Sequence, residues 1–83
     1  MFETLLNRMR TELPGYEWLL RDGGHYEDGT SGEYFAHVLD PRQGYRADGG
    51  YMVSHIFYGD EPLATWEKAI DAAVAELQPA NGG

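Results

Sequence analysis

Apolar residues recur at helical spacing near both ends of the chain. Within residues 2–13 they fall at i, i+3, i+4, i+7 and i+11, and a Pro-Gly pair ends the pattern. The later pattern begins at Pro62, which suits the first turn of a helix that Asp60 or Glu61 can cap, and Pro79 ends it. Because this spacing lines one side of a helix, we predict one helix over 2–13 and another between the two prolines. The residues expected on the two buried stripes are Phe2, Leu5, Leu6, Met9, Leu13, Leu63, Trp66, Ile70, Ala73 and Leu77.

Three stretches between these helices have the short, aromatic and β-branched character of strands. We predict them at residues 16–21, 33–40 and 51–58. The segments that separate them are polar: residues 22–32 hold four glycines and are expected to be irregular, and residues 41–50 form a second loop. Loops this long in a small domain could carry recognition, or they could be tolerated insertions.

The predicted order of elements is α-β-β-β-α, which defines an α+β fold class. Short connections favour a three-stranded antiparallel sheet with two helices packed on one face. The chain shows no internal repeat and no linker. We therefore expect residues 1–79 to form a single α+β domain and residues 80–83 to form a flexible C-terminal tail.

The alternation of side chains along the second and third strands sorts the sheet into two faces. With Val38 opposite Val53, the face expected to form the core carries Phe35, Leu39, Met52 and Ile56. The face expected to stay open carries Tyr34, Tyr51, His55 and Phe57. An uncovered aromatic patch of this kind usually marks an interface. A one-residue slip of register would exchange the faces, and the aromatics could also simply complete a small core.

The charge of the chain narrows its possible partners. It has 14 Asp and Glu against 6 Lys and Arg, a formal net charge of −8 on 83 residues. The acids are dispersed among apolar residues that keep good periodicity, so the chain is expected to fold. Domains that bind nucleic acid directly neutralise phosphates with clustered Lys and Arg. Here that cluster is missing, and the domain would repel a phosphate backbone.

The remaining composition points to an ordinary cytoplasmic domain. The chain has no cysteine, so no disulfide framework or thiolate metal site supports the fold. The first residues do not read as a signal peptide, and no apolar run approaches the length of a membrane span. We expect a cytoplasmic protein, in the host cell if a phage encodes it.

Candidate chemistry is sparse, and we expect no enzyme, metal or cofactor. His37 and His55 fall on opposite faces in the predicted register, so they would not converge on one ion. Ser54 and His55 point to opposite faces of a strand, which excludes them as a nucleophile–base pair. His25, Glu27 and Asp28 could bind a cation adventitiously, and a third hypothesis makes them the centre of an enzyme.

Carboxylates and tyrosines form the candidate partner-binding set. Glu67 and Asp71 are four residues apart on the second helix, at a spacing comparable to that of phosphates along a nucleic acid. Asp60 projects near the same side, and a second acidic cluster lies in or beside the first loop. The alternative is a solvated acidic face on which Lys68 partly relieves the repulsion between the carboxylates. The full set of candidates is Asp22, Glu27, Asp28, Glu33, Asp60, Glu67, Asp71, Tyr26, Tyr45 and Tyr51.

Two resemblances add to this interpretation. The order of elements resembles that of the double-stranded-RNA-binding domain, but acids occupy the start of the second helix, Asp60 to Lys68, where that family needs bases. The family's function therefore does not carry over. In size and in its dispersed acids the chain also resembles the small acidic inhibitors of phages and mobile elements, anti-CRISPR proteins above all. That resemblance implies binding, as a DNA mimic, to the basic nucleic-acid-binding surface of a CRISPR effector complex.

These observations lead to two main hypotheses. The first is a non-enzymatic, anti-CRISPR-type inhibitor whose acids steer it to a basic partner while a tyrosine or two anchors the contact. The second is a small regulatory or structural interaction domain that forms a homodimer through the open aromatic face of its sheet. In that case the charge serves solubility alone.

Overall fold

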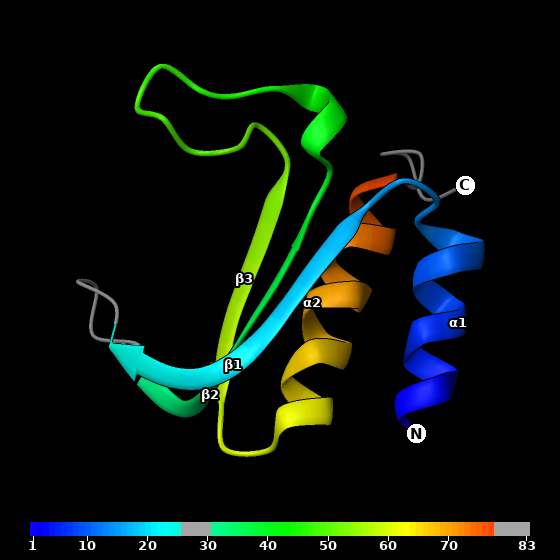
Figure 1. Ribbon diagram of the computed structural model, residues 1–83, viewed down its shortest axis with the longest axis vertical. Helices are drawn as coiled ribbons and strands as arrows, with labels where there is room; N and C mark the ends of the chain where they lie inside the picture. Colours follow the sequence, from blue (N-terminus) through cyan, green and yellow to red (C-terminus); the bar gives the residue numbers. More distant parts are fainter. Residues whose placement is uncertain (26–30, 78–83) are drawn as a thin grey trace.

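A computed structural model describes residues 1–25 and 31–77 and confirms the α-β-β-β-α order (Figure 1). The strands form one antiparallel sheet in the order β1-β2-β3. Both helices lie on the same side of it. The elements are α1 Phe2–Glu12, β1 Glu17–His25, β2 Ser31–Leu39, the 3-10 turn η1 Pro41–Gln43, β3 Ser54–Gly59 and α2 Pro62–Leu77.

Helix α1 ends one residue earlier than predicted, at a turn that lies close to Arg42, just beyond the end of β2. The Leu13 N–H donates to the Met9 carbonyl, and Gly15 then takes a positive φ of 86° that reverses the chain. A side chain at Gly15 would collide with the guanidinium of Arg42. Glycine suits this turn because of its backbone conformation, while the exposed Arg42 side chain could move aside.

Helix α2 lies close against the sheet. Its buried residues include Trp66, Ala69, Ile70 and Ala73, whereas Leu77, predicted on the buried stripe, is 55% exposed. The Thr65 hydroxyl donates to the Glu61 carbonyl at 2.6 Å and lies where a side chain at Gly59 would be. The strand and the helix can approach this closely because Gly59 has no side chain.

The register between β2 and β3 differs from the predicted one by two residues. Val38 lies opposite His55, not Val53. The predicted strand over 51–58 begins only at Ser54, because residues 44–53 belong to the loop, where Tyr45 and Tyr51 form an isolated bridge. The two-residue shift keeps the predicted grouping of side chains into faces.

The assignment of those faces to core and surface was wrong, although Leu39, predicted in the core, is buried. Ala36 and Val38 of β2 are fully buried beneath α2, and Trp18 and Phe57 pack beside them. Met52, predicted in the core, is 55% exposed in the loop. The physical reason is volume: the stacked rings of Trp66 and Trp18 fill the space between helix and sheet, so the β2 residues beside them, Ala36 and Val38, are small. The residues predicted to be open that instead lie on the helix side are Tyr34, His55 and Phe57.

The glycine-rich segment is more regular than predicted. Strand β1 continues to His25 and β2 starts at Ser31, so that Gly24 pairs with Gly32. A side chain at Gly32 would meet the backbone of Gly59, which explains why this ladder uses glycine. Residues 26–30 and 78–83, the latter including the predicted tail, lie outside the described residues.

Candidate functional site

The side of the sheet turned away from the helices is the candidate site. In the observed register its side chains alternate with the buried ones, and α1 and α2 both lie on the other side (Figure 1). Leu19 on this face is 43% exposed. The other members from the three strands are Glu17, Arg21, Glu33, Phe35, His37, Leu39, Ser54, Ile56 and Tyr58, and of these only Leu39 is buried.

Five rings on this side follow one another in contact, and we call them the aromatic row. Tyr58 and Phe35 have ring centroids 5.4 Å apart, and Phe35 and His37 are 6.0 Å apart. The row continues from His37 to Tyr51 at 6.3 Å and from Tyr51 to Tyr45 at 4.9 Å. The first three contacts are edge-on, a favourable geometry for aromatic pairs. The row therefore runs from β3 across β2 and into the β2–β3 loop.

A buried carboxylate holds the loop that supplies the two tyrosines. Asp40 Oδ1 accepts from the Arg42 backbone N–H at 3.1 Å and from its Nε at 2.8 Å, and Oδ2 accepts from Gln43 at 3.1 Å. Hydrogen bonding to Arg42, supported by Gln43, lowers the pKa of the Asp40 carboxyl to about 2. The anchored turn directs the following loop away from the helices, as Figure 1 shows.

The far part of the loop is closed by its own hydrogen bonds. The Met52 N–H donates to the Gly44 carbonyl at 2.9 Å, and the Arg46 N–H donates to the Gly50 carbonyl at 2.6 Å. Gly44 and Gly49 have positive φ angles of 82° and 92°. These bonds fix the loop as a bent hairpin and bring Tyr45 and Tyr51 side by side.

His37 and Arg21 give the middle of the row its polar character. The Nε2 atom of His37 is buried with no hydrogen-bond partner in the structure, and burial, followed by the charge of His55, lowers the pKa of His37. The guanidinium of Arg21 lies 5.1 Å from the centre of the Phe35 ring. The row can thus stack against a planar cation, as it already does with Arg21.

Exposed carboxylates lie at both ends of the row. At one end hydrogen bonding to Tyr45 raises the pKa of Tyr51, and the nearby charge of Glu17 adds to this effect. At the other end the Glu33 N–H donates to Asp60 Oδ1 at 3.4 Å. Glu33 and Asp60, two of the candidates from sequence, are therefore brought together beside the aromatic row.

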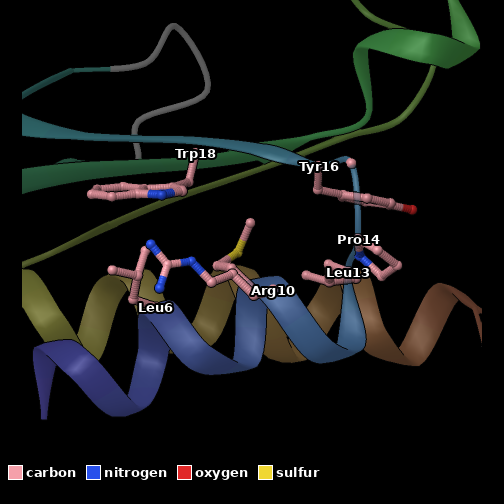
Figure 2. Close-up of a pocket in the computed structure, with 8 residues that line it drawn as sticks. Leu6, Arg10, Leu13, Pro14, Tyr16 and Trp18 are labelled. Atoms are coloured by element: carbon pink, nitrogen blue, oxygen red, sulfur yellow. The ribbon is translucent and has the colours of Figure 1, made fainter.

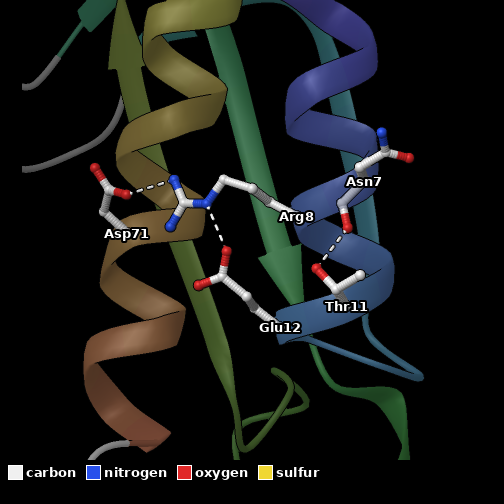
Figure 3. Close-up of polar contacts among 5 residues, drawn as sticks. All are labelled: Asn7, Arg8, Thr11, Glu12 and Asp71. Carbon is white, nitrogen blue, oxygen red and sulfur yellow. Dashed lines mark hydrogen bonds and ion pairs between the residues drawn. The ribbon is translucent and has the colours of Figure 1, made fainter.

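The two candidate acids of α2 lie on the opposite side of the sheet. Asp71 accepts from the Arg8 guanidinium of α1 at 2.8 Å, and Arg8 also binds Glu12 at 3.0 Å (Figure 3). Arg8 thus relieves part of the charge on this side. Glu67 and Asp71 cannot share one flat contact surface with Tyr45 and Tyr51, because the sheet separates them.

The remaining candidates divide in the same way. Asp22 is exposed near the end of β1, opposite Tyr34 and on the helix side. Tyr26, Glu27 and Asp28 lie outside the described residues, so the acidic cluster of the first loop stays a prediction. Among residues 1–25 and 31–77, no group of three His, Cys, Asp or Glu could hold a metal ion.

Sequence reasoning missed the middle of the site. Phe35 was assigned to the core, and His37 and Tyr58 were given no part in binding, although alternation along β2 and β3 places all three on one face. The signal that could have found them is the pair of small residues, Ala36 and Val38, on the other face. When a helix carries a buried tryptophan, the strand that packs against it needs small residues on that face. Such residues therefore indicate which face of the strand packs against the helix.

Searches for relatives add nothing to this geometry. A scan against protein-family models, a search of the curated proteins and a search of the solved structures each returned no match. The resemblance to anti-CRISPR proteins therefore stays a prediction. In the part of the chain that the structure describes, no helix has the length and apolar character needed to cross a membrane.

Proposed function

We propose that this protein is a non-enzymatic binding protein that occupies a basic surface of a protein partner through the open face of its sheet. The observation that carries the proposal is the aromatic row with exposed carboxylates at both ends. Tyrosine and other aromatic residues dominate the energetic centres of protein interfaces, and charges usually form their rims. The open face has both parts in that arrangement.

The cationic character of the partner follows from two properties of the face. Aromatic rings attract guanidinium groups, and the contact of Arg21 with Phe35 is an internal example. The carboxylates Glu17, Glu33 and Asp60 can form charge-assisted hydrogen bonds with arginine. A net charge of −8 adds a field that speeds the encounter with a basic surface.

A basic protein surface of this kind most often binds nucleic acid, so the protein would act as a competitor of nucleic acid. The resemblance to small acidic phage inhibitors supports the nucleic-acid-binding surface of a CRISPR effector complex as the target. We propose that the partner contacts the open face of the sheet and not α2. The acids of α2 then contribute to the long-range field alone.

A nine-residue arginine peptide is a defined probe for this proposal. We expect NMR chemical-shift changes to concentrate on β2, β3 and the β2–β3 loop when the peptide is added to the full chain. Glu33→Gln should weaken binding several-fold, whereas Glu67→Gln, which removes the same charge from α2, should change it less than twofold. Shift changes centred on α2, or equal effects of the two substitutions, would overturn the proposal.

The second candidate is a homodimer through the same face, which the exposure of Leu19 (43%) beside the row favours. Sedimentation in low and high salt separates the two functions. Two copies that each carry −8 associate more tightly as salt screens their repulsion, whereas binding to a basic partner weakens. A dimer that strengthens with salt and is lost in Tyr58→Glu would favour the homodimer.

A further inference from the structure

A groove lies between α1 and the outer edge of β1, on the opposite side of the sheet from the aromatic row. Its volume is about 410 Å³. Leu6 and Met9 of α1 line one wall together with Leu13, which follows the helix, and Tyr16 and Trp18 line the other (Figure 2). Trp18 stacks on the buried Trp66 with ring centroids 4.2 Å apart, so this wall is a firm extension of the core.

The groove exists because two helices cover more width than three strands provide. Helices packed side by side lie about 8–10 Å apart, and strands about 4.8 Å apart, so two helices cover about four strands. Helix α2 packs closely on β2 and β3, while α1 packs on α2 and stays farther from the sheet. Since β1 pairs only with β2 among the described strands, its outer edge is open beside α1. Among residues 1–25 and 31–77, nothing therefore occupies the place of a fourth strand.

Arg10 indicates what kind of segment could fill this place. Its side chain lines the groove and turns into it, as Figure 2 shows. Within the described residues, Arg8, Arg42 and Arg46 bind carboxylates and Arg21 lies against a ring, but no ion pair or ring contact involves Arg10. An unpaired guanidinium at the wall of an apolar groove suits an occupant with an apolar part and a carboxylate.

A second copy of this chain does not fit the vacant place. If β1 of a twofold-related copy paired with β1, its own α1 would have to lie over the same two strands as the first α1. Two helices would then occupy one position. A strand that brings no helix of its own avoids this collision.

We propose that the edge of β1 and the groove together bind an extended segment of a protein partner as a fourth strand. Backbone hydrogen bonds to β1 would hold the segment, and alternate side chains would enter the groove. From Leu6 to Leu13 the helix rises about 10 Å, the length of about three extended residues. The segment therefore places apolar residues i and i+2 in the groove and a carboxylate at Arg10. This site is separate from the open face and does not depend on the function proposed for it.

A library of displayed seven-residue peptides, selected on the full chain, tests this proposal. Selected sequences should carry two apolar residues at i and i+2 with an acidic residue or a free C-terminus beside them. A synthetic peptide of the selected sequence should bind Arg10→Gln about tenfold more weakly than the wild type. Lys68→Gln is the matched control, because it also removes one exposed positive charge from a helix, outside the groove; its affinity should stay within twofold.

Hydrogen exchange locates the bound peptide. Amides of β1 should exchange more slowly in the complex, while those of the outer edge of β3 should not change. Three results would overturn the proposal: a library that yields no binder, peptides that bind Arg10→Gln as tightly as the wild type, or protection on β3 or the loop in place of β1. The first result leaves the function proposed for the open face unaffected, because that rests on a different probe.

Discussion

The two faces of this sheet are built from the same three strands but follow opposite rules. On the helix side the strand residues are small where α2 approaches, and Trp66 fills the space between the layers. On the open side the strands carry large rings that contact one another and solvent. The comparison teaches that two of the large rings of the sheet, Phe35 and Tyr58, lie outside its core. Packing is decided by the volume that the helix brings, and the rings left over are available for a partner.

Trp66→Ala should have the largest effect of any substitution on this comparison. Trp66 is fully buried and contacts both Trp18 and Phe2. Loss of a buried aromatic side chain costs about 3–5 kcal/mol, a large share of the about 4–12 kcal/mol expected for a domain of this length. Urea denaturation should show the unfolding midpoint strongly lowered. Trp66→Phe keeps a ring and removes an N–H that has no partner in the structure, so it should lose less. Similar losses in both variants would contradict this account.

Asp40→Asn should have the second largest effect on stability, and this effect should depend on pH. The pKa of Asp40 is about 2 in the folded protein, against an ordinary value of 3.8. A carboxyl whose pKa is lowered by folding stabilises the fold at any pH above its pKa in the unfolded chain. This contribution is lost as the pH falls through its pKa in the folded protein. The wild type should thus lose this contribution to stability between about pH 4 and about pH 2. Asp40→Asn has no carboxylate at this position and therefore lacks the contribution at every pH. The urea midpoints of both proteins at pH 7, 4 and 2.5 measure this difference. If the two midpoints fall in parallel with pH, ionisation of Asp40 does not contribute to stability.

Phe35→Ala should separate stability from binding. Phe35 is half-buried on the open face, so we expect a loss of about 1–2 kcal/mol, well below that of Trp66→Ala. Because Phe35 joins Tyr58 to His37 in the aromatic row, binding of the arginine peptide should fall at least as much as for any carboxylate substitution. The two properties are measured by urea denaturation and by NMR titration. A stability loss equal to that of Trp66→Ala would mean that the open face is part of the core.

Tyr45→Ala should change stability least. The side chain is 65% exposed, and exposed substitutions usually stay within about 0.5 kcal/mol. If Tyr45 anchors a partner, peptide affinity should still fall several-fold. Glu67→Gln serves as a control that alters neither property much. If the affinity of Tyr45→Ala is unchanged, the binding surface includes only the part of the aromatic row that lies on the strands.

Periodicity in the sequence predicted the elements and their order because each helix has an uninterrupted apolar stripe and clear end signals. It could not choose the core face, since both faces of β2 are apolar and the choice depends on the volume of Trp66 from a distant segment. The start of β3 was misplaced because Tyr51, Met52 and Val53 have strand-like character. In the structure the Asp40 N–H donates to the Val53 carbonyl and the Met52 N–H donates to the Gly44 carbonyl, and these bonds hold the segment in a loop.

The candidate site was predictable only in part, for a related reason. Tyr45 and Tyr51 stood out as aromatic residues in and beside a polar loop, and the structure places them together at one end of the row. Glu67 and Asp71 stood out by their spacing. The partner of Asp71 is Arg8, 63 residues away, and no local pattern reveals such a contact. Spacing within one helix shows which acids are neighbours, but not which of them are already paired.

The Trp18–Trp66 stack also gives the protein an optical signature. Both tryptophans of the chain belong to this one stack, so their emission and near-ultraviolet circular dichroism come from a single place, where the core meets the groove. Two indoles 4.2 Å apart couple their electronic transitions, and the coupled signal is lost as soon as the rings separate. An occupant of the groove would therefore alter the spectrum directly, whereas a partner on the aromatic row would leave it nearly unchanged. The unlabelled protein can thus report which of its two surfaces is in use.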